Sequence, residues 1–100
     1  MPFMYILRCR DGSYYTGSTD KDPELRLWEH NHDEHLAARY TIKRRPLVLV
    51  YLEEFERIDA AFAREKQVQR WSRAKKQALI DGRGHDLPVL SRTRREPPAR

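Results

Sequence analysis

The stretch FMYILRCRDGSYYTGST at residues 3–19 decides the fold. Its first part, Phe3–Cys9, is rich in aromatic and β-prone side chains and predicts a strand. The Asp11-Gly12 pair is a hairpin turn signal, so residues 14–19 predict a short antiparallel return strand. Side chains alternate between the two faces of a strand. We therefore expect one face of the first strand to carry Phe3, Tyr5 and Leu7, and the other face to carry Met4 and Ile6.

A helix and a polar connection follow the hairpin. Asp20 to Pro23 supply a cap and a proline suited to a first helical turn, so we expect a helix over Pro23–Asn31. Residues 32–45 are polar and basic, and they fit either a short helix or a loop.

The second half of the chain predicts a strand and a long helix. The continuous apolar run at residues 47–52 is typical of a central strand buried on both faces. The longest helical pattern covers Ile58–Ile80 and ends near Gly82. Its apolar residues share one stripe, which consists of Ile58, Ala61, Phe62, Val68, Leu79 and Ile80. Glu65 lies within that stripe and needs a cation, a donor or a metal beside it, because an unpaired buried carboxylate is costly.

Together these elements predict an α/β (α+β) fold, a small three-stranded antiparallel sheet flanked by helices. Its body is one domain over residues 1–80, followed by a basic, flexible tail at residues 81–100. The length of 100 residues fits about one small domain.

Several classes of protein are excluded by the same composition. A run of about 18 apolar residues is lacking, so we expect no transmembrane helix and no membrane partner. The first residues do not resemble a signal peptide, which makes a cytoplasmic protein the expectation. The single cysteine, Cys9, rules out an internal disulfide and a Cys-rich zinc module.

The charge balance indicates an anionic partner. Lys and Arg number 20 against 15 Asp and Glu, which gives a net charge of +5. The positive charges gather in two stretches, residues 39–45 and residues 64–76. Such clusters fit a nucleic-acid footprint, with ordinary solubilising charge as the alternative.

Five residues could carry chemistry, and each has a plainer interpretation. Tyr5 and Tyr15 stand on adjacent strands, where aromatic pairs also stabilise sheets. Arg26 and His30 share one helix face, which could equally be a solvated polar face. Glu65 could form a structural salt bridge with a neighbour such as Arg26.

In combination, these residues resemble the GIY-YIG nuclease domain, in particular its small stand-alone bacterial members of the UPF0213 type. The likeness covers residues 3–80. Arg26 and His30 are similar to the helix arginine and histidine of that family. The motifs that carry the rest of the resemblance are Tyr5-Ile6-Leu7, Tyr15-Thr16-Gly17, Ala38-Arg39-Tyr40-Thr41, Arg44-Arg45-Pro46, Ala63-Arg64-Glu65 and Trp71-Ser72-Arg73-Ala74-Lys75-Lys76.

This resemblance implies a metal-dependent endonuclease that hydrolyses phosphodiester bonds in DNA, in repair, recombination or the processing of branched DNA. It implies that Glu65 holds Mg²⁺ or Mn²⁺ and that Arg26 faces the scissile phosphate. Tyr5 would act as the base with Tyr15 as its hydrogen-bonding partner, although the reverse assignment stays open. A phenol needs nearby positive charge to ionise near neutral pH. Arg26, His30 and the metal could supply that charge.

The basic stretches would then bind the backbone phosphates of the DNA substrate. The expected contact residues are Arg39, Tyr40, Lys43, Arg44, Arg45, Arg70, Arg73, Lys75 and Lys76. If about six engage, affinity should fall by roughly 10³ between 50 and 200 mM salt. Phosphate contacts carry no direct sequence code, so we expect low sequence specificity, recognition of DNA structure, or a partner protein that supplies specificity. The sequence leaves the oligomeric state open.

The chain also departs from the family pattern. The family glycine before the first tyrosine motif is absent, and Phe3 and Met4 stand there; residues 19–24 are one residue longer than usual, and no asparagine follows Asn31. The alternative function is therefore a nucleic-acid-binding module that keeps the fold without useful turnover. A structural domain with solubilising charge is the third possibility.

Overall fold

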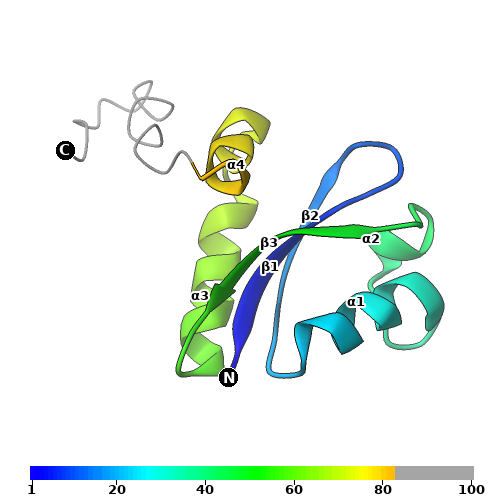
Figure 1. Cartoon of the computed structure of the whole chain (residues 1–100), viewed down its shortest axis with the longest axis horizontal. Coiled ribbons are helices and arrows are strands. Elements are labelled where there is room, and N and C mark those ends of the chain that lie inside the picture. Colours follow the sequence, from blue (N-terminus) through cyan, green and yellow to red (C-terminus); the bar gives the residue numbers. More distant parts are fainter. Residues whose placement is uncertain (83–100) are drawn as a thin grey trace. The chain divides into compact units, whose positions relative to one another are not determined.

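The structure is a computed structural model of the chain, and it describes residues 1–82. Residues 1–69 form one compact unit, and a second begins at residue 70. The elements, drawn in Figure 1, are β1 (Phe3–Arg8), β2 (Tyr14–Thr19), α1 (Pro23–His32), α2 (Arg39–Ile42), β3 (Val48–Glu54), α3 (Ile58–Gln69) and α4 (Arg73–Ile80). Within residues 1–82, none of the helices is long and apolar enough to cross a membrane.

The sheet has three antiparallel strands, as the sequence predicts, and their order is β2-β1-β3. The middle strand, β1, is covered on both faces, since Met4, Tyr5, Ile6 and Leu7 are at most 2% exposed. Figure 1 shows α3 on one side of the sheet and α1 with α2 on the other. Each face of β1 therefore meets a different set of helices.

The prediction of a central strand at residues 47–52 is wrong. The corresponding strand, β3, lies at the edge of the sheet, and Val48 and Leu52 are 48% and 41% exposed. The central position belongs to β1 because it pairs with its hairpin partner on one side and with β3 on the other. A continuous apolar run does not by itself distinguish these two positions.

The predicted single helix over Ile58–Ile80 is in fact two helices. The first, α3, ends at Gln69, and Ser72 starts the second by accepting a hydrogen bond from the backbone N–H of Lys75 at 3.2 Å. A serine that caps a new helix interrupts the old one. The predicted stripe is also incomplete, because Phe62 is 51% exposed.

The remaining elements agree with the sequence in part. Asp22 caps α1 by accepting from the N–H of Glu24, and Pro23 occupies the first turn as expected, while the helix runs on to His32. Within residues 32–45 the short helix α2 is flanked by irregular chain, so both alternatives apply. The predicted tail from residue 81 falls outside the described residues from position 83 onward.

Candidate active site

Gly17 allows Tyr5 to cross the neighbouring strand. The two residues face each other in the β1–β2 ladder. A Cβ atom at position 17 would lie 2.5 Å from the Tyr5 hydroxyl oxygen, which is far too close for any side chain. The ring of Tyr5 therefore lies across Gly17 and carries its hydroxyl over β2, the edge strand.

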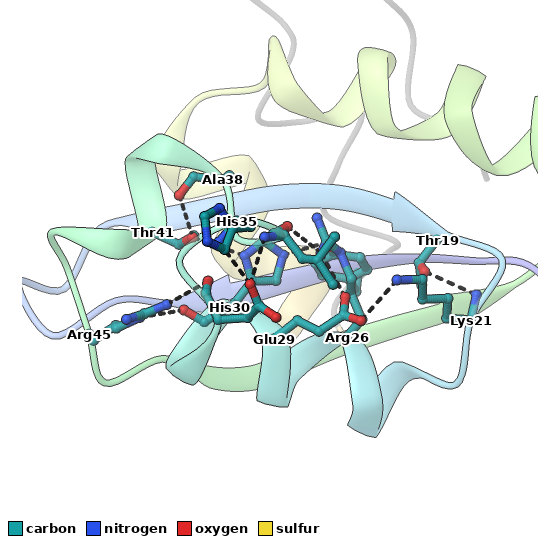
Figure 2. A network of polar contacts seen from close by, with 12 residues as sticks. Thr19, Lys21, Arg26, Glu29, His30, His35, Ala38, Thr41 and Arg45 are labelled. Atoms are coloured by element: carbon teal, nitrogen blue, oxygen red, sulfur yellow. Dashed lines mark hydrogen bonds and ion pairs between the residues drawn. The ribbon is translucent and has the colours of Figure 1, made fainter.

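The Tyr5 hydroxyl meets His30 of α1. The distance from the phenolic oxygen to His30 Nε2 is 2.8 Å. On its other side, His30 Nδ1 lies 2.9 Å from Thr41 Oγ1, which in turn donates to the carbonyl of Ala38 at 2.8 Å (Figure 2). The ring of Tyr15 lies 5.3 Å from the His30 ring. Because the side chain of His30 is fully buried, these protein groups rather than solvent surround its ring.

Burial keeps both members of the Tyr5–His30 pair neutral. It lowers the pKa of His30 to about 4, with the charge of Arg26 acting in the same direction. It raises the pKa of Tyr5 to about 12, and here the charge of Arg26 opposes the shift. The expectation that His30 supplies positive charge to favour a phenolate is therefore wrong. His30 is instead a neutral ring in contact with a neutral phenol.

Arg26 is held in place by a buried carboxylate. Its Nη1 donates to Glu29 Oε1 at 2.9 Å and to the carbonyl of Leu36 at 2.7 Å, while Lys21 Nζ donates to Glu29 Oε2 at 2.8 Å (Figure 2). The bond from Lys21, followed by that from Arg26, holds the pKa of Glu29 below its usual value. Because Glu29 and His30 are both buried, this face of α1 is not a solvated polar face.

Glu65 approaches the same edge of the sheet from the opposite face. Ser18, next to Gly17 on β2, donates to Glu65 Oε1 at 2.6 Å, and Gln69 donates to Oε2 at 2.7 Å. Burial raises the pKa of Tyr15, and the charge of Glu65 is the next cause. The same charge contributes to the raised pKa of Tyr5. Glu65 thus acts electrostatically on both phenols.

The salt bridge between Glu65 and Arg26, which the sequence left open, is not formed, since Arg26 pairs with Glu29. The Glu65 carboxylate instead pairs with Lys66, whose Nζ lies 3.5 Å from Oε2.

A divalent ion fits the chemistry of the Glu65 carboxylate. Residues 1–82 contain no group of three or more His, Cys, Asp and Glu side chains that could hold a metal. Mg²⁺, however, commonly keeps several waters and uses one or two carboxylates together with substrate phosphates. The hydrogen bonds from Ser18 and Gln69 and the ion pair with Lys66 use three of about four acceptor positions on the carboxylate, so one position for an ion remains.

A basic hollow adjoins the tyrosines. It has a volume of about 620 Å³ and is lined by four of the predicted contact residues, Arg39, Tyr40, Lys43 and Arg44. Tyr40 stacks on Tyr15 with the ring centres 6.0 Å apart, and the Arg44 guanidinium lies 3.7 Å from the centre of the Tyr40 ring. Tyr40 thus lines the hollow and also contacts Tyr15 of the candidate site.

The other predicted contact residues are arranged differently. Arg45 donates to the backbone carbonyls of His30 and Asp33 at 2.7 and 3.0 Å (Figure 2). It satisfies carbonyls at the end of α1, so we leave it out of the contact surface. The last four belong to the second unit, where their role stays a prediction: Arg70, Arg73, Lys75 and Lys76.

Sequence reasoning missed the residues that support the site. Glu29 and Thr41 lie beside or within the motifs of the family but received no role, and Gly17 counted only as part of the second tyrosine motif. Gln69 lies four positions after Glu65 on one helix, a spacing that could have indicated their contact, whereas for Ser18 the sequence offers no local signal because it meets Glu65 only in the folded chain.

The fold is that of a small α+β domain, and the class to which the sequence assigns it is that of nuclease domains. The model of the GIY-YIG catalytic domain matches residues 1–78. The chain belongs to the GIY-YIG family, a family of nucleases that act on nucleic acids.

Individual relatives agree with this assignment. A UPF0213 protein of Staphylococcus saprophyticus is 45% identical over 78 residues, which are 78% of this chain and 92% of the relative. A UPF0213 protein of Staphylococcus aureus strain N315 is 43% identical over 81 residues, 81% of this chain and 95% of the relative. The solution NMR structure of the UPF0213 protein BH0048 from Bacillus halodurans has 34% identity and a TM-score of 0.51, and it covers 92% of this chain and 96% of its own.

Proposed function

We propose that this protein is a metal-dependent endonuclease that hydrolyses phosphodiester bonds in DNA, acting in repair, recombination or the processing of branched DNA. One observation carries the proposal. Two phenols, a guanidinium, an imidazole and a carboxylate from four different elements converge on the β2 edge of the sheet. Hydrolysis of a phosphodiester needs a base for the attacking water and positive charge at the phosphate, and these residue types can supply both.

Tyr5 serves as the base in this proposal. It takes a proton from the attacking water as its own proton passes to His30 Nε2, 2.8 Å away. Such a transfer requires a neutral imidazole, which the low pKa of His30 provides near pH 7. The anionic phosphate of the substrate adds negative charge beside Arg26 and thereby favours protonation of His30.

Arg26 stabilises the charge that develops on the phosphate. The ion pair with Glu29 restricts the guanidinium to one position, and a cation that is already in place needs no reorganisation during the reaction.

Glu65 is the residue that would hold Mg²⁺ or Mn²⁺. When bound, such an ion acts as a Lewis acid that stabilises negative charge on the leaving oxygen. Ser18 and Gln69 orient the carboxylate for that task through their hydrogen bonds.

The hollow lined by Arg39, Tyr40, Lys43 and Arg44 would receive the phosphates that flank the cut. A partner protein is one source of specificity in this proposal, because phosphate contacts carry no direct sequence code.

The second candidate function is a nucleic-acid-binding module without useful turnover. Two observations favour it. The Glu65 carboxylate already has hydrogen-bond donors on both oxygens, and the pKa of Tyr5 lies near 12, well above that of a ready base. Such a module would bind DNA in a salt-dependent way and yield no product.

A cleavage assay separates the two functions. Full-length protein is incubated with linear, supercoiled and four-way branched DNA, in Mg²⁺, in Mn²⁺ and in EDTA. An endonuclease produces nicks or cuts only with the metal. Glu65→Ala should abolish cutting and preserve binding, because it removes the metal-binding carboxylate but none of the residues of the hollow.

Glu56→Ala is the matched control, because Glu56 is an exposed carboxylate outside the site. It should cut like the wild type. Binding without any metal-dependent product would establish the binding module, and cleavage that survives Glu65→Ala would exclude the proposed role of Glu65.

A further inference from the structure

We infer that Thr41 sets the tautomer of His30 and thereby assigns Tyr5, rather than Tyr15, as the phenol that passes on its proton. The tautomer follows from contacts within the fold alone. The catalytic part rests on the proposed function.

The hydrogen bonds around His30 permit a single arrangement of protons. The carbonyl of Ala38 can only accept, so the hydroxyl hydrogen of Thr41 points to it. Thr41 Oγ1 then has only lone pairs to offer and must accept from His30, which places a hydrogen on Nδ1. A neutral imidazole carries one ring hydrogen, so Nε2 is a bare acceptor. The Tyr5 hydroxyl, 2.8 Å away, must therefore donate to it.

This direction is the one that proton transfer requires. The O–H bond of Tyr5 points at a ring nitrogen with a free lone pair, so one bond can break as the N–H bond forms. The transferred proton ends on Nε2, and the phenolic oxygen takes a proton from water in exchange. Tyr15 approaches the same ring at a tilt of 60°, with the centres 5.3 Å apart. The structure thus provides an acceptor in line with Tyr5.

Thr41 is a positioning residue, since it touches His30 and not the reacting atoms. Its hydroxyl is fully buried, as is His30, so water is not at hand to replace the contact. If Thr41 is replaced by valine, the Nδ1 hydrogen loses its acceptor. The ring then gains by moving its hydrogen to Nε2 and donating to Tyr5, whose own proton no longer has an acceptor.

The test is NMR spectroscopy of histidine ring nitrogens in the full-length protein at pH 7. Long-range proton–nitrogen correlations distinguish a protonated Nδ1 from a protonated Nε2. We expect His30 with hydrogen on Nδ1 in the wild type, in Thr41→Ser and in Tyr5→Phe, and on Nε2 in Thr41→Val. The exposed His32 and His35 serve as internal controls, because their ring signals should not change with Thr41.

The wild-type spectrum shows which ring nitrogen of His30 carries the hydrogen even if Thr41→Val fails to fold. Hydrogen on Nε2 in the wild type overturns the inference. Loss of the Nδ1 form in Tyr5→Phe also overturns it, because Tyr5 rather than Thr41 would then set the tautomer.

Kinetics test the catalytic part. Thr41→Val should lower kcat by about 10²-fold with little change in KM, within the range that positioned bases contribute, and Thr41→Ser should restore most of it. Equal kcat values for the valine variant and the wild type would overturn that part. Absence of cleavage by the wild type would contradict the proposed function, whereas the tautomer is still decided by the spectra.

Discussion

The two sides of the sheet contribute to the candidate site in different ways. On the α1 side, Tyr5, His30 and Thr41 form a buried chain of hydrogen bonds in which each group has a defined partner. On the α3 side the Glu65 carboxylate accepts from two neutral donors, Ser18 and Gln69, and lies beside the half-exposed ammonium group of Lys66.

This difference indicates a division of labour. A closed network fixes protons and geometry, so changes on the α1 side should alter kcat and stability together. A lightly held carboxylate can accept a further ligand, so changes on the α3 side should alter mainly the dependence on metal concentration.

Tyr5→Phe should have the largest effect. It removes the proton relay and should lower kcat by about 10²–10⁴-fold, with the metal concentration at half-maximal rate unchanged. Tyr15→Phe, which leaves the Tyr5–His30 bond intact, should cost about tenfold or less. Single-turnover cleavage across a Mg²⁺ series measures both. A larger loss with Tyr15→Phe would reverse the assignment of the two tyrosines.

Gly17→Ala should also act through Tyr5. The added methyl group meets the phenolic oxygen at 2.5 Å, so the ring must move away from His30. We expect a loss in kcat of about 10²-fold and a destabilisation of about 1–3 kcal/mol, as for other overpacked sites. Denaturant unfolding and the cleavage assay are the measurements. Wild-type stability and rate would show that the ring does not depend on the glycine.

Acid should destabilise the α1 side through His30. Its folded pKa of about 4 lies below the ordinary value of 6.5, so the unfolded chain binds a proton that the folded chain does not. Stability is therefore full above pH 6.5 and falls as the pH drops toward 4, by about 2 kcal/mol between pH 7 and 5. Urea unfolding curves in this range measure it.

The control for the acid effect is a pair of histidine variants. His30→Gln should flatten the stability profile between pH 7 and 5, whereas His32→Gln, at an exposed position, should not. Equal slopes in the two variants would contradict a neutral, buried His30.

Glu29→Gln should test how Arg26 is held. The variant keeps the shape of the side chain and loses the charge that pairs with Arg26 and Lys21. We expect kcat to fall about tenfold through a less ordered guanidinium, and stability to fall by about 1–2 kcal/mol. Lys21→Gln removes only the half-exposed partner and should cost under about 1 kcal/mol. Equal effects of the two would contradict a specific role in positioning Arg26.

The sequence predicts the hairpin well because its signals are local. Alternation and the turn at Asp11-Gly12 are enough to place β1 and β2. The order of the strands and the break between α3 and α4 could not be predicted in the same way. The first depends on which strand finds two partners, and the second on a cap at Ser72 that competes with a continuous apolar pattern.

For the candidate site, too, the sequence predicts some features and not others. The five residues brought to the β2 edge could be named from motif spacing, while their protonation states could not. The sequence suggested that His30 carries a positive charge, and the neutral form follows only from complete burial next to Arg26. Likewise Ser18 and Gln69 meet Glu65 across 47 and 4 positions, and only the packing of α3 against β2 brings Ser18 into contact.

The smallest expected effects concern surface charge, where the two sides also differ. Arg39 and Lys43 line the hollow beside α2, whereas Arg57 on the α3 side is paired with Asp59. Replacing Arg39 or Lys43 by glutamine should each reduce the slope of log affinity against log salt concentration by about 0.9 and leave base preference unchanged. Arg57→Gln should not change the slope. Fluorescence anisotropy with labelled DNA between 50 and 200 mM salt measures it. A reduced slope for Arg57→Gln alone would indicate that nucleic acid contacts the α3 side and not the hollow beside α2.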